Sequence, residues 1–170
     1  MGRDLRLRRV DMADAETLFR WRNDPEAREN SFQTQPIVYD EHIAWLDKTL
    51  RDSSQEIYIL CEGDTPIGQV RLSTEDDAAT VNYSIDAAHR AQGYGRVILQ
   101  LVENLCVERG EPCALRGYVK KKNIASQIVF ETLGYECGEM PDKNCLLYVK
   151  YKLQRSLVTE DKFAGGEHSS

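Results

Sequence analysis

Residues 89–100, HRAQGYGRVILQ, carry a polar turn directly into an apolar and periodic segment. Two glycines, Gly93 and Gly95, stand where that segment begins. Glycine lets a backbone approach a neighbour closely and adopt a positive φ. The first N–H groups of a helix have no partner within it and carry partial positive charge. With Arg90 and Arg96 beside it, the stretch predicts either an anion-binding helix start or a simple helix cap.

Two familiar phosphate-binding loops do not fit this stretch. A dinucleotide-binding fingerprint requires a third glycine at the position that Ile98 occupies here. A P-loop requires the pattern G-x-x-x-x-G-K-[ST], which does not occur in the chain. The choice between a cap and another anionic ligand therefore depends on the rest of the sequence.

The chain has 170 residues, of which 41% are hydrophobic and 29% charged, as in a single globular domain. We expect the domain to span residues 1–153, and residues 154–170 to form a flexible tail. A net charge of −6 argues against nucleic acid as the main partner. No apolar run approaches the ~20 residues of a membrane span, and no signal peptide is evident, so we expect a cytoplasmic protein without a membrane partner. A monomer and a homodimer are both compatible with these features.

The chain contains five cysteines, and no pair has the C-x-x-C spacing of a zinc or redox site. They are Cys61, Cys106, Cys113, Cys137 and Cys145. Because four of the five lie in apolar segments, we expect buried free thiols in a reducing compartment. We expect no metal site.

Hydrophobic patterns predict an α/β fold with the element order β-α-α-β-β-β-α-β-α-β-β. The expected strands span 4–10, 56–62, 66–74, 79–86, 112–119, 135–140 and 145–153, and the expected helices end near residues 22, 50, 108 and 134. Pro25 disfavours helix in the residue before it, so we expect the first helix to stop there and residues 26–38 to be irregular. Antiparallel runs that alternate with β-α-β units imply a mixed, mostly antiparallel sheet with helices on both faces.

A second motif decides what the glycine turn binds. R-x-x-G-x-G between a strand and a helix resembles the acetyl-CoA signature of the GCN5-related N-acetyltransferases (GNAT superfamily). The segment NIASQIVFETLGY is similar to the family's second motif, N-x-x-A-x-x-x-Y-x-x-x-G-F, and matches it at Asn123, Ser126, Phe130, Gly134 and Tyr135. The resemblance covers residues 4–153 and implies an N-acetyltransferase with the GNAT fold that uses acetyl-CoA.

The resemblance also implies which residues contact acetyl-CoA. Backbone N–H groups of residues 92–96 would bind the pyrophosphate, and the strand at residues 83–85 would bond the pantetheine and polarise the thioester carbonyl. Asn123 and Ser126 would lie beside the thiol. The full set is Tyr83, Ser84, Ile85, Arg90, Gln92, Gly93, Tyr94, Gly95, Arg96, Asn123, Ser126 and Phe130.

The chain departs from the family at the position of the usual acid. Many members carry a tyrosine that protonates the leaving thiolate, whereas this chain has Phe130, which has no proton to give. Ser126 ranks ahead of Tyr135 or water as the replacement. For the base, His42 and Ser84 are the candidates that we name as catalytic together with Ser126, and Asn82 and Glu75 stay open. Tyr83 and Ser84 must face opposite sides of the sheet, but the pattern does not say which side lines the cleft.

The N-terminal third is expected to shape the acceptor site. FRWRNDPEARENS and VYDEHIAWL resemble the branch that acetylates nucleotide-linked amino sugars, such as the UDP-4-amino-sugar N-acetyltransferases of the pseudaminic acid pathway. The resemblance implies that Arg22, Asn30 and His42 face the acceptor. A planar, always charged guanidinium suits a diphosphate.

Other interpretations remain at this stage. Arg22 can simply complement a helix dipole, and His42 can be a solvated surface residue. The enzyme can instead acetylate protein N-termini, as the ribosomal-protein acetyltransferases of the same superfamily do. A module that binds acyl-CoA without catalysis is a further alternative, which Phe130 supports.

Overall fold

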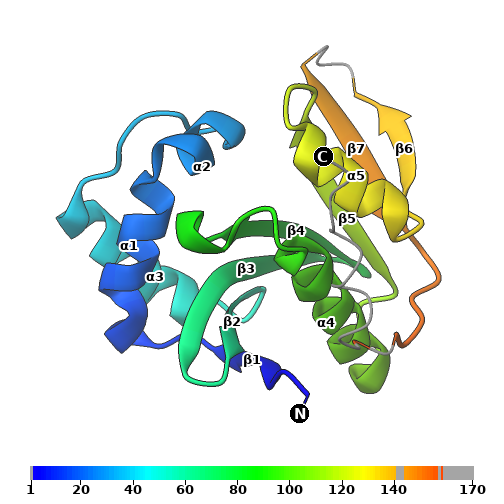
Figure 1. Ribbon diagram of the computed structural model, residues 1–170, viewed down its shortest axis with the longest axis horizontal. Coiled ribbons are helices and arrows are strands. Elements are labelled where there is room, and N and C mark those ends of the chain that lie inside the picture. Colours follow the sequence, from blue (N-terminus) through cyan, green and yellow to red (C-terminus); the bar gives the residue numbers. More distant parts are fainter. Residues whose placement is uncertain (1, 141–143, 157, 159–170) are drawn as a thin grey trace, which may run out of the picture.

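The computed structural model describes residues 2–140, 144–156 and 158. Its main elements are β1 (Leu5–Arg9), α1 (Ala15–Asn23), α2 (Pro25–Asn30), α3 (Tyr39–Arg51), β2 (Gln55–Glu62), β3 (Thr65–Glu75), β4 (Ala78–Ile85), α4 (Tyr94–Arg109), β5 (Ala114–Lys120), α5 (Ile124–Thr132), β6 (Glu136–Glu139) and β7 (Cys145–Lys150). Two 3-10 turns, η1 (Met12–Asp14) and η2 (Ala87–His89), precede α1 and α4. The strands form one sheet in the order β1-β2-β3-β4-β5-β7-β6, in which only β4 and β5 are parallel (Figure 1). The expected α/β fold with a mixed, mostly antiparallel sheet is confirmed.

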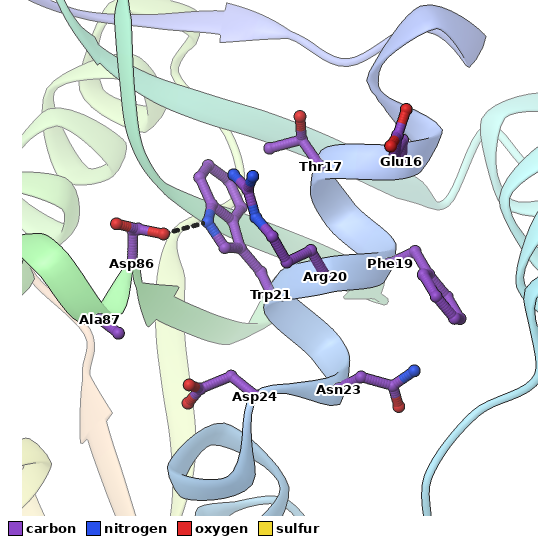
Figure 2. A pocket seen from close by; sticks show the side chains of 9 residues that line it. All are labelled: Glu16, Thr17, Phe19, Arg20, Trp21, Asn23, Asp24, Asp86 and Ala87. Carbon is purple, nitrogen blue, oxygen red and sulfur yellow. Dashed lines mark hydrogen bonds between the residues drawn. The ribbon is translucent and has the colours of Figure 1, made fainter.

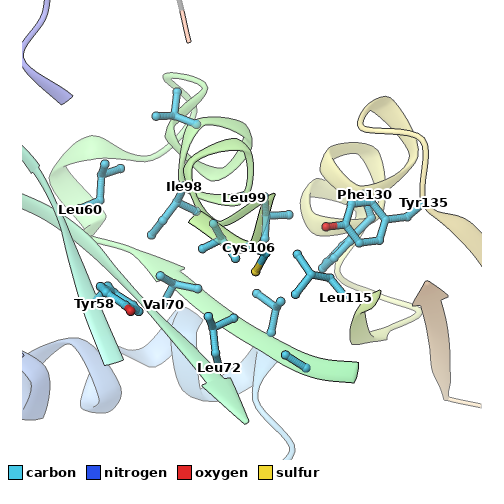
Figure 3. Close-up of a cluster of buried hydrophobic side chains, with 14 of the residues drawn as sticks. Tyr58, Leu60, Val70, Leu72, Ile98, Leu99, Cys106, Leu115, Phe130 and Tyr135 are labelled. Carbon is cyan, nitrogen blue, oxygen red and sulfur yellow. The ribbon is translucent and has the colours of Figure 1, made fainter. Parts of the chain in front are cut away.

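Strand β2 separates two hydrophobic cores because its successive side chains point to opposite faces of the sheet. Ile57 and Ile59 pack with Leu18, Trp21 and Leu46 of α1 and α3. On the other face, the larger core gathers side chains of β2, β3, β5, α4 and α5 (Figure 3). Helices therefore cover both faces, as the sequence predicts.

Helix α2 corrects the expectation that residues 26–38 are irregular. Pro25 begins this helix instead of only ending the one before it. The carboxylate of Asp24 accepts a hydrogen bond of 3.0 Å from the N–H of Ala27 and so caps the new helix. Proline is well suited to the first helical position, where an N–H would have no partner within the helix.

Strands β4 and β5 pair only at their beginnings. Residues 78–80 of β4 pair with residues 114–116 of β5, and the two strands then diverge, as Figure 1 shows. Strand β4 continues to Ile85 and stays paired with β3 on its other edge. Beyond Thr80, the edge of β4 that faces β5 therefore keeps backbone groups without a strand partner.

The prediction that four cysteines are buried is wrong. All five are free, but only Cys61, Cys106 and Cys145 are buried. Cys113 lies in the turn before β5, and Cys137 lies on the edge strand β6, where one side of the strand has no neighbour. Apolar neighbours along the sequence did not show whether a cysteine lies on an edge strand or on a central strand of the sheet.

Part of the expected C-terminal tail is described and contacts the domain. Ser156 makes two hydrogen bonds with Asn104 of α4. The Asn104 side-chain amide donates to the Ser156 carbonyl at 2.9 Å, and the Ser156 N–H donates to the Asn104 side-chain oxygen at 2.8 Å. Val158 packs against the larger core. Residue 157 and residues 159–170, which belong to the same expected tail, lie outside the described residues. Within the described part of the chain, no helix combines the length and apolarity that crossing a bilayer requires.

Candidate active site

The two glycines of the opening stretch have different structural causes. Gly93 caps α4 with φ at 85°, the left-handed region that favours glycine. Gly95 lies in the first turn of α4, where an added Cβ would come within 3.2 Å of the Tyr83 ring. The first glycine therefore makes the turn, and the second lets the helix pack closely against β4.

The two arginines of the turn are in different surroundings. Arg90 donates to Asp24 at 2.6 Å, to Glu26 at 2.8 Å and to the carbonyl of Ile85 at 3.1 Å. Its positive charge is thus paired with Glu26 in α2 and with Asp24, the residue before α2. Arg96, by contrast, has a buried Nε with no hydrogen-bond partner among the described residues. A buried unpaired donor at a helix start is suited to an anionic ligand.

The side chains of Tyr94 and Gln92 both have hydrogen-bond partners within the protein. The Tyr94 hydroxyl donates to Glu62, and its side chain is buried. The Gln92 amide bonds the carbonyl of Ala88 at 3.3 Å. Any contact that these residues make with a pyrophosphate would therefore use their backbone N–H groups, as the resemblance implies.

Two hydroxyls from the two sequence motifs meet between β4 and α5. The Tyr83 hydroxyl lies 2.8 Å from Ser126 Oγ. Asn123 caps α5 and accepts a hydrogen bond of 3.2 Å from the N–H of Ser126, which places Ser126 in the first helical turn. Burial raises the pKa of Tyr83 to about 12, although the hydrogen bond with Ser126 acts in the other direction.

Phe130 belongs to the core and is only 2% exposed. Its ring stacks on Tyr148 at 5.3 Å between centroids and meets Tyr135 edge-on at 4.9 Å. Burial and the nearby charge of Glu103 raise the pKa of Tyr135, so this second candidate acid holds its proton tightly. The surface that Phe130 presents to a ligand is small, and its contact with acetyl-CoA stays a prediction.

The structure answers which way each side chain of β4 faces. Tyr83 packs toward α4 and α5, whereas Ser84 lies on the opposite face and its Oγ accepts a hydrogen bond of 3.1 Å from the Gln69 amide. Arg71 and Asn82, which are register partners, are on the same face as Ser84. Glu75 lies further along β3, where it is exposed and 3.5 Å from Arg116. Ser84 is thus on the side of α1 and α3, which is the expected acceptor side.

His42 is 1% exposed, so the interpretation as a solvated surface residue is wrong. Its Nε2 lies 2.9 Å from the carbonyl of Ala15, and its Nδ1 lies 3.1 Å from Nη1 of Arg22. Since a carbonyl only accepts, Nε2 carries the proton and Nδ1 accepts from the guanidinium. Burial lowers the pKa of His42, and the charge of Arg22 acts in the same direction. A direct role of this side chain as base would require one of these bonds to break.

Arg22 is one of two arginines that lie over the ring of Trp45. Its guanidinium carbon is 4.1 Å from the ring centroid, and that of Arg71 is 5.5 Å away. Burial lowers the pKa of Arg22, and the positive charge of Arg71 lowers it further. Arg71 lies in no motif and was not predicted from the sequence, and Trp45 lies within the segment VYDEHIAWL, where the sequence assigned it no role. The alternation of Gln69, Arg71 and Ser73 along β3 indicated a polar face and nothing more specific.

Asn30, the remaining candidate for acceptor binding, ends α2. The neighbouring Glu29 is held at the end of β5, because its carbonyl accepts a hydrogen bond of 3.0 Å from Lys120 and its carboxylate lies 3.6 Å from Lys122. Helix α2 therefore bridges from α1 to the far side of the divergence between β4 and β5.

A cavity of about 860 Å³ lies between α1 and η2 (Figure 2). Trp21 donates to Asp86 at 2.7 Å across its wall. None of the site residues expected from the sequence lines it. Two of its carboxylates, Asp24 and Asp86, are bonded to protein donors, and the bond from Trp21 to Asp86 joins α1 to the end of β4.

Comparison with known proteins agrees with this architecture. The spermidine N-acetyltransferase of Vibrio cholerae, solved with CoA and spermine, superposes with a TM-score of 0.80 at 15% identity and covers 87% of this chain and 95% of that one. An acetyltransferase of Salmonella typhimurium that modifies the N-terminal serine of ribosomal protein L7/L12 superposes with a TM-score of 0.72 at 17% identity, over 86% of this chain and 94% of that one. At such identities, the likeness concerns the fold.

Sequence comparisons are more specific. The chain is 25% identical over 118 residues to Acetyltransferase PseH of Campylobacter jejuni, an alignment that covers 67% of this chain and 71% of that protein. Residues 4–136 match the family described as acetyltransferase (GNAT) domain. The residues present suit the acetyl-CoA that this family uses, since Arg96 has an unpaired buried donor and the edge of β4 has free backbone groups. The chain therefore belongs to the GNAT acetyltransferases and is an N-acetyltransferase that takes its acetyl group from acetyl-CoA.

Proposed function

We propose that the protein acetylates the amine of a nucleotide-linked amino sugar. The observation that carries this proposal is the pair Arg22 and Arg71 over the ring of Trp45. Both guanidiniums are partly buried and close enough for the charge of one to affect the other. Among the described residues, no carboxylate lies within salt-bridge distance of either.

Two like charges held together without a counter-ion are costly, and a bound anion would offset that cost. A diphosphate carries the matching charge, and guanidiniums bind phosphate oxygens through paired N–H donors. A cavity of about 280 Å³ adjoins the pair and is lined by Trp45, Lys48, Thr49, Asp52, Gln55, Arg71 and Ser73. The position of the pair on the expected acceptor side of β4 supports a diphosphate that belongs to the acceptor.

The same charges argue against a polyamine acceptor, because a polycation would be repelled by two uncompensated arginines. The likeness to PseH and the resemblance of the N-terminal third to the amino-sugar branch point in the same direction as the charge argument. An uncharged peptide N-terminus gains nothing from either arginine. We also propose a cytoplasmic location, which suits five free thiols.

The proposed roles of the site residues follow from their positions. The N–H groups of residues 92–96 and the guanidinium of Arg96 bind the pyrophosphate of CoA, and Asn123 and the edge of β4 hold the pantetheine. Bound acetyl-CoA supplies an activated acetyl group. Ser126 lies at the thiol, and Ser84 and Asn30 face the acceptor. His42 accepts a hydrogen bond from Arg22 and so orients the guanidinium toward the diphosphate.

Release of free CoA thiol from acetyl-CoA tests this proposal. The acceptors to compare are UDP-linked amino sugars, the same amino sugars without the nucleotide, N-terminal peptides and polyamines. We expect transfer to the nucleotide-linked compounds and inhibition of that transfer by UDP. Transfer confined to peptides or to polyamines would refute the amino-sugar proposal and leave the acetyltransferase activity intact.

A further inference from the structure

The ring of Phe130 is oriented so that the tyrosine of the family motif has no place here. Its Cζ atom, which would carry the hydroxyl of a tyrosine, faces β5, where a Cβ added to Gly117 would lie only 2.4 Å away. Tyr135 and Tyr148 enclose the remaining edges of the ring. A hydroxyl at this position would point into the core and not toward the divergence of β4 and β5.

The hydroxyl pair of Tyr83 and Ser126 lies between β4 and α5. The Tyr83 ring is 6.3 Å from that of Phe130 between centroids, and its hydroxyl bonds Ser126 at 2.8 Å. The same hydroxyl lies 3.5 Å from the position of a Cβ on Gly95, in the first turn of α4. The pair thus sits where the first turns of both motif helices approach β4, and a helix start stabilises negative charge.

Either hydroxyl can donate in this bond, and the deep burial of Tyr83 favours the tyrosine as the donor. Within the described residues, Ser126 Oγ is the only hydrogen-bond partner that the Tyr83 hydroxyl has. A buried hydroxyl whose hydrogen has no acceptor destabilises the fold, so the tyrosine donates its hydrogen to the serine. The hydrogen of Ser126 is then free to point elsewhere.

We propose that Tyr83 is a positioning residue, whose hydrogen bond to Ser126 directs the serine hydrogen to the sulfur of CoA as it departs. The inference rests on the proposed placement of Ser126 at the thiol. It does not depend on which amine is acetylated.

The transfer balances as follows. The lone pair of the neutral amine forms a bond to the acetyl carbon, the carbon–sulfur bond breaks, and its electron pair stays on sulfur. The hydrogen bond from Ser126 stabilises the resulting thiolate, which then takes a proton from water, while the amine gives its extra proton to water. Tyr83 keeps its proton throughout. Its pKa of about 12 agrees with this, because a tyrosinate would be unfavourable there.

A double-mutant cycle with Tyr83→Phe and Ser126→Ala tests the inference. A hydrogen bond to a charged group changes a rate by roughly 10- to 100-fold. We expect Ser126→Ala to lower kcat within that range, Tyr83→Phe to lower it about tenfold, and KM for acetyl-CoA to change little. The double variant should be no slower than Ser126→Ala, because Tyr83 acts through Ser126. Ser126→Thr, which keeps a hydroxyl, should restore most of the rate.

A second readout does not require turnover. The thiol of CoA bound to the protein can be titrated by the ultraviolet absorbance of its thiolate. Loss of the hydrogen bond should raise that thiol pKa by about one unit, a tenfold change in ionisation, in both single variants and no further in the double variant. Tyr148→Phe is the matched control. It removes a buried hydroxyl that donates to Glu131, which lies on the same helix as Ser126, but it removes no hydrogen bond of Ser126.

The outcomes separate the inference from the proposals on which it rests. Multiplicative losses in the double variant, or an unchanged thiol pKa in Tyr83→Phe, would overturn the role of Tyr83 while Ser126 keeps its own. An unchanged thiol pKa in Ser126→Ala would overturn the placement of Ser126 and the inference with it. Failure of amino-sugar acceptors alone would affect neither, because the titration needs no acceptor.

Discussion

Nη2 of Arg90 lies 2.6 Å from Oδ2 of Asp24, an ion pair that joins the glycine turn before α4 to the first residue of the turn into α2. The two residues are 66 positions apart in the chain. Arg90 belongs to the expected binding site for the acetyl donor, and Asp24 lines the cavity between α1 and η2. The pair therefore ties the start of α2 to the turn before α4.

Replacing Asp24 with asparagine should test this coupling. Asparagine keeps an oxygen that can cap α2 but removes the charge that Arg90 contacts. Burial acts against ionisation of Asp24, but the hydrogen bonds from Arg90 and Ala27 hold its pKa below the usual range. We expect the free energy of unfolding to fall by about 1 kcal/mol and KM for acetyl-CoA to rise a few-fold. Urea denaturation and steady-state kinetics measure both. Asp47→Asn, which breaks the exposed pair with Arg51, should change stability by less than about 0.5 kcal/mol.

Replacing Arg71 with methionine should weaken binding of a phosphate-bearing acceptor. The loss of one charge-assisted contact predicts a roughly 10- to 100-fold rise in its KM, with kcat for the bound substrate little changed. Titration calorimetry with UDP should show the same loss. Arg51→Met is the control, because Arg51 lies on α3 in an exposed pair with Asp47. Equal UDP affinity in the two variants would contradict the proposed anion site.

Gly93 and Gly110 offer a matched test of the donor site. Both have a positive φ, 85° and 77°, and they cap opposite ends of α4. Alanine at either position should cost about 1 kcal/mol or somewhat more of stability, since an L-residue is strained there. Only Gly93→Ala should raise KM for acetyl-CoA, and the bulkier Gly93→Val should raise it further. If the two alanine variants have the same KM, the turn is a cap and nothing more.

The burial of His42 predicts a pH-dependent loss of stability. The folded protein keeps this imidazole neutral because burial lowers its pKa, whereas the unfolded chain takes up a proton near pH 6.5. The unfolded state therefore binds more protons as the pH falls below about 6.5, so stability is full above that pH and declines below it. Denaturation curves between pH 5 and pH 8 should show a shallower decline for His42→Gln than for the wild type. Parallel pH profiles would show that other groups cause the decline.

Phe130→Tyr should not restore the acid of the family motif. The added hydroxyl would meet the backbone near Gly117, and overpacking of this kind costs about 1–3 kcal/mol. We expect a lower melting temperature and no gain in kcat. A faster enzyme of unchanged stability would mean that the ring turns out of the core toward the thiol.

Local sequence patterns predicted most of the elements because strands and long helices carry a regular hydrophobic period. Helix α4, with its apolar face and the glycines Gly93 and Gly110, begins and ends within a residue of the expected positions. Helix α2 was missed because six residues without a buried side chain have no apolar period. The one signal was Asp24 followed by Pro25, which is typical of a helix start as well as a helix end.

The sequence by itself predicted the family, which the comparisons show, and the residues expected to form the donor half of the site, because each of those two motifs lies within one turn and one helix. Which side chains of β4 lie on the expected acceptor side was decided only by the tertiary structure. The same holds for the pairs Arg22–Arg71 and Tyr83–Ser126, the second of which spans 43 positions. Such contacts depend on strand register and on how helices pack against the sheet, and no spacing along the chain records them.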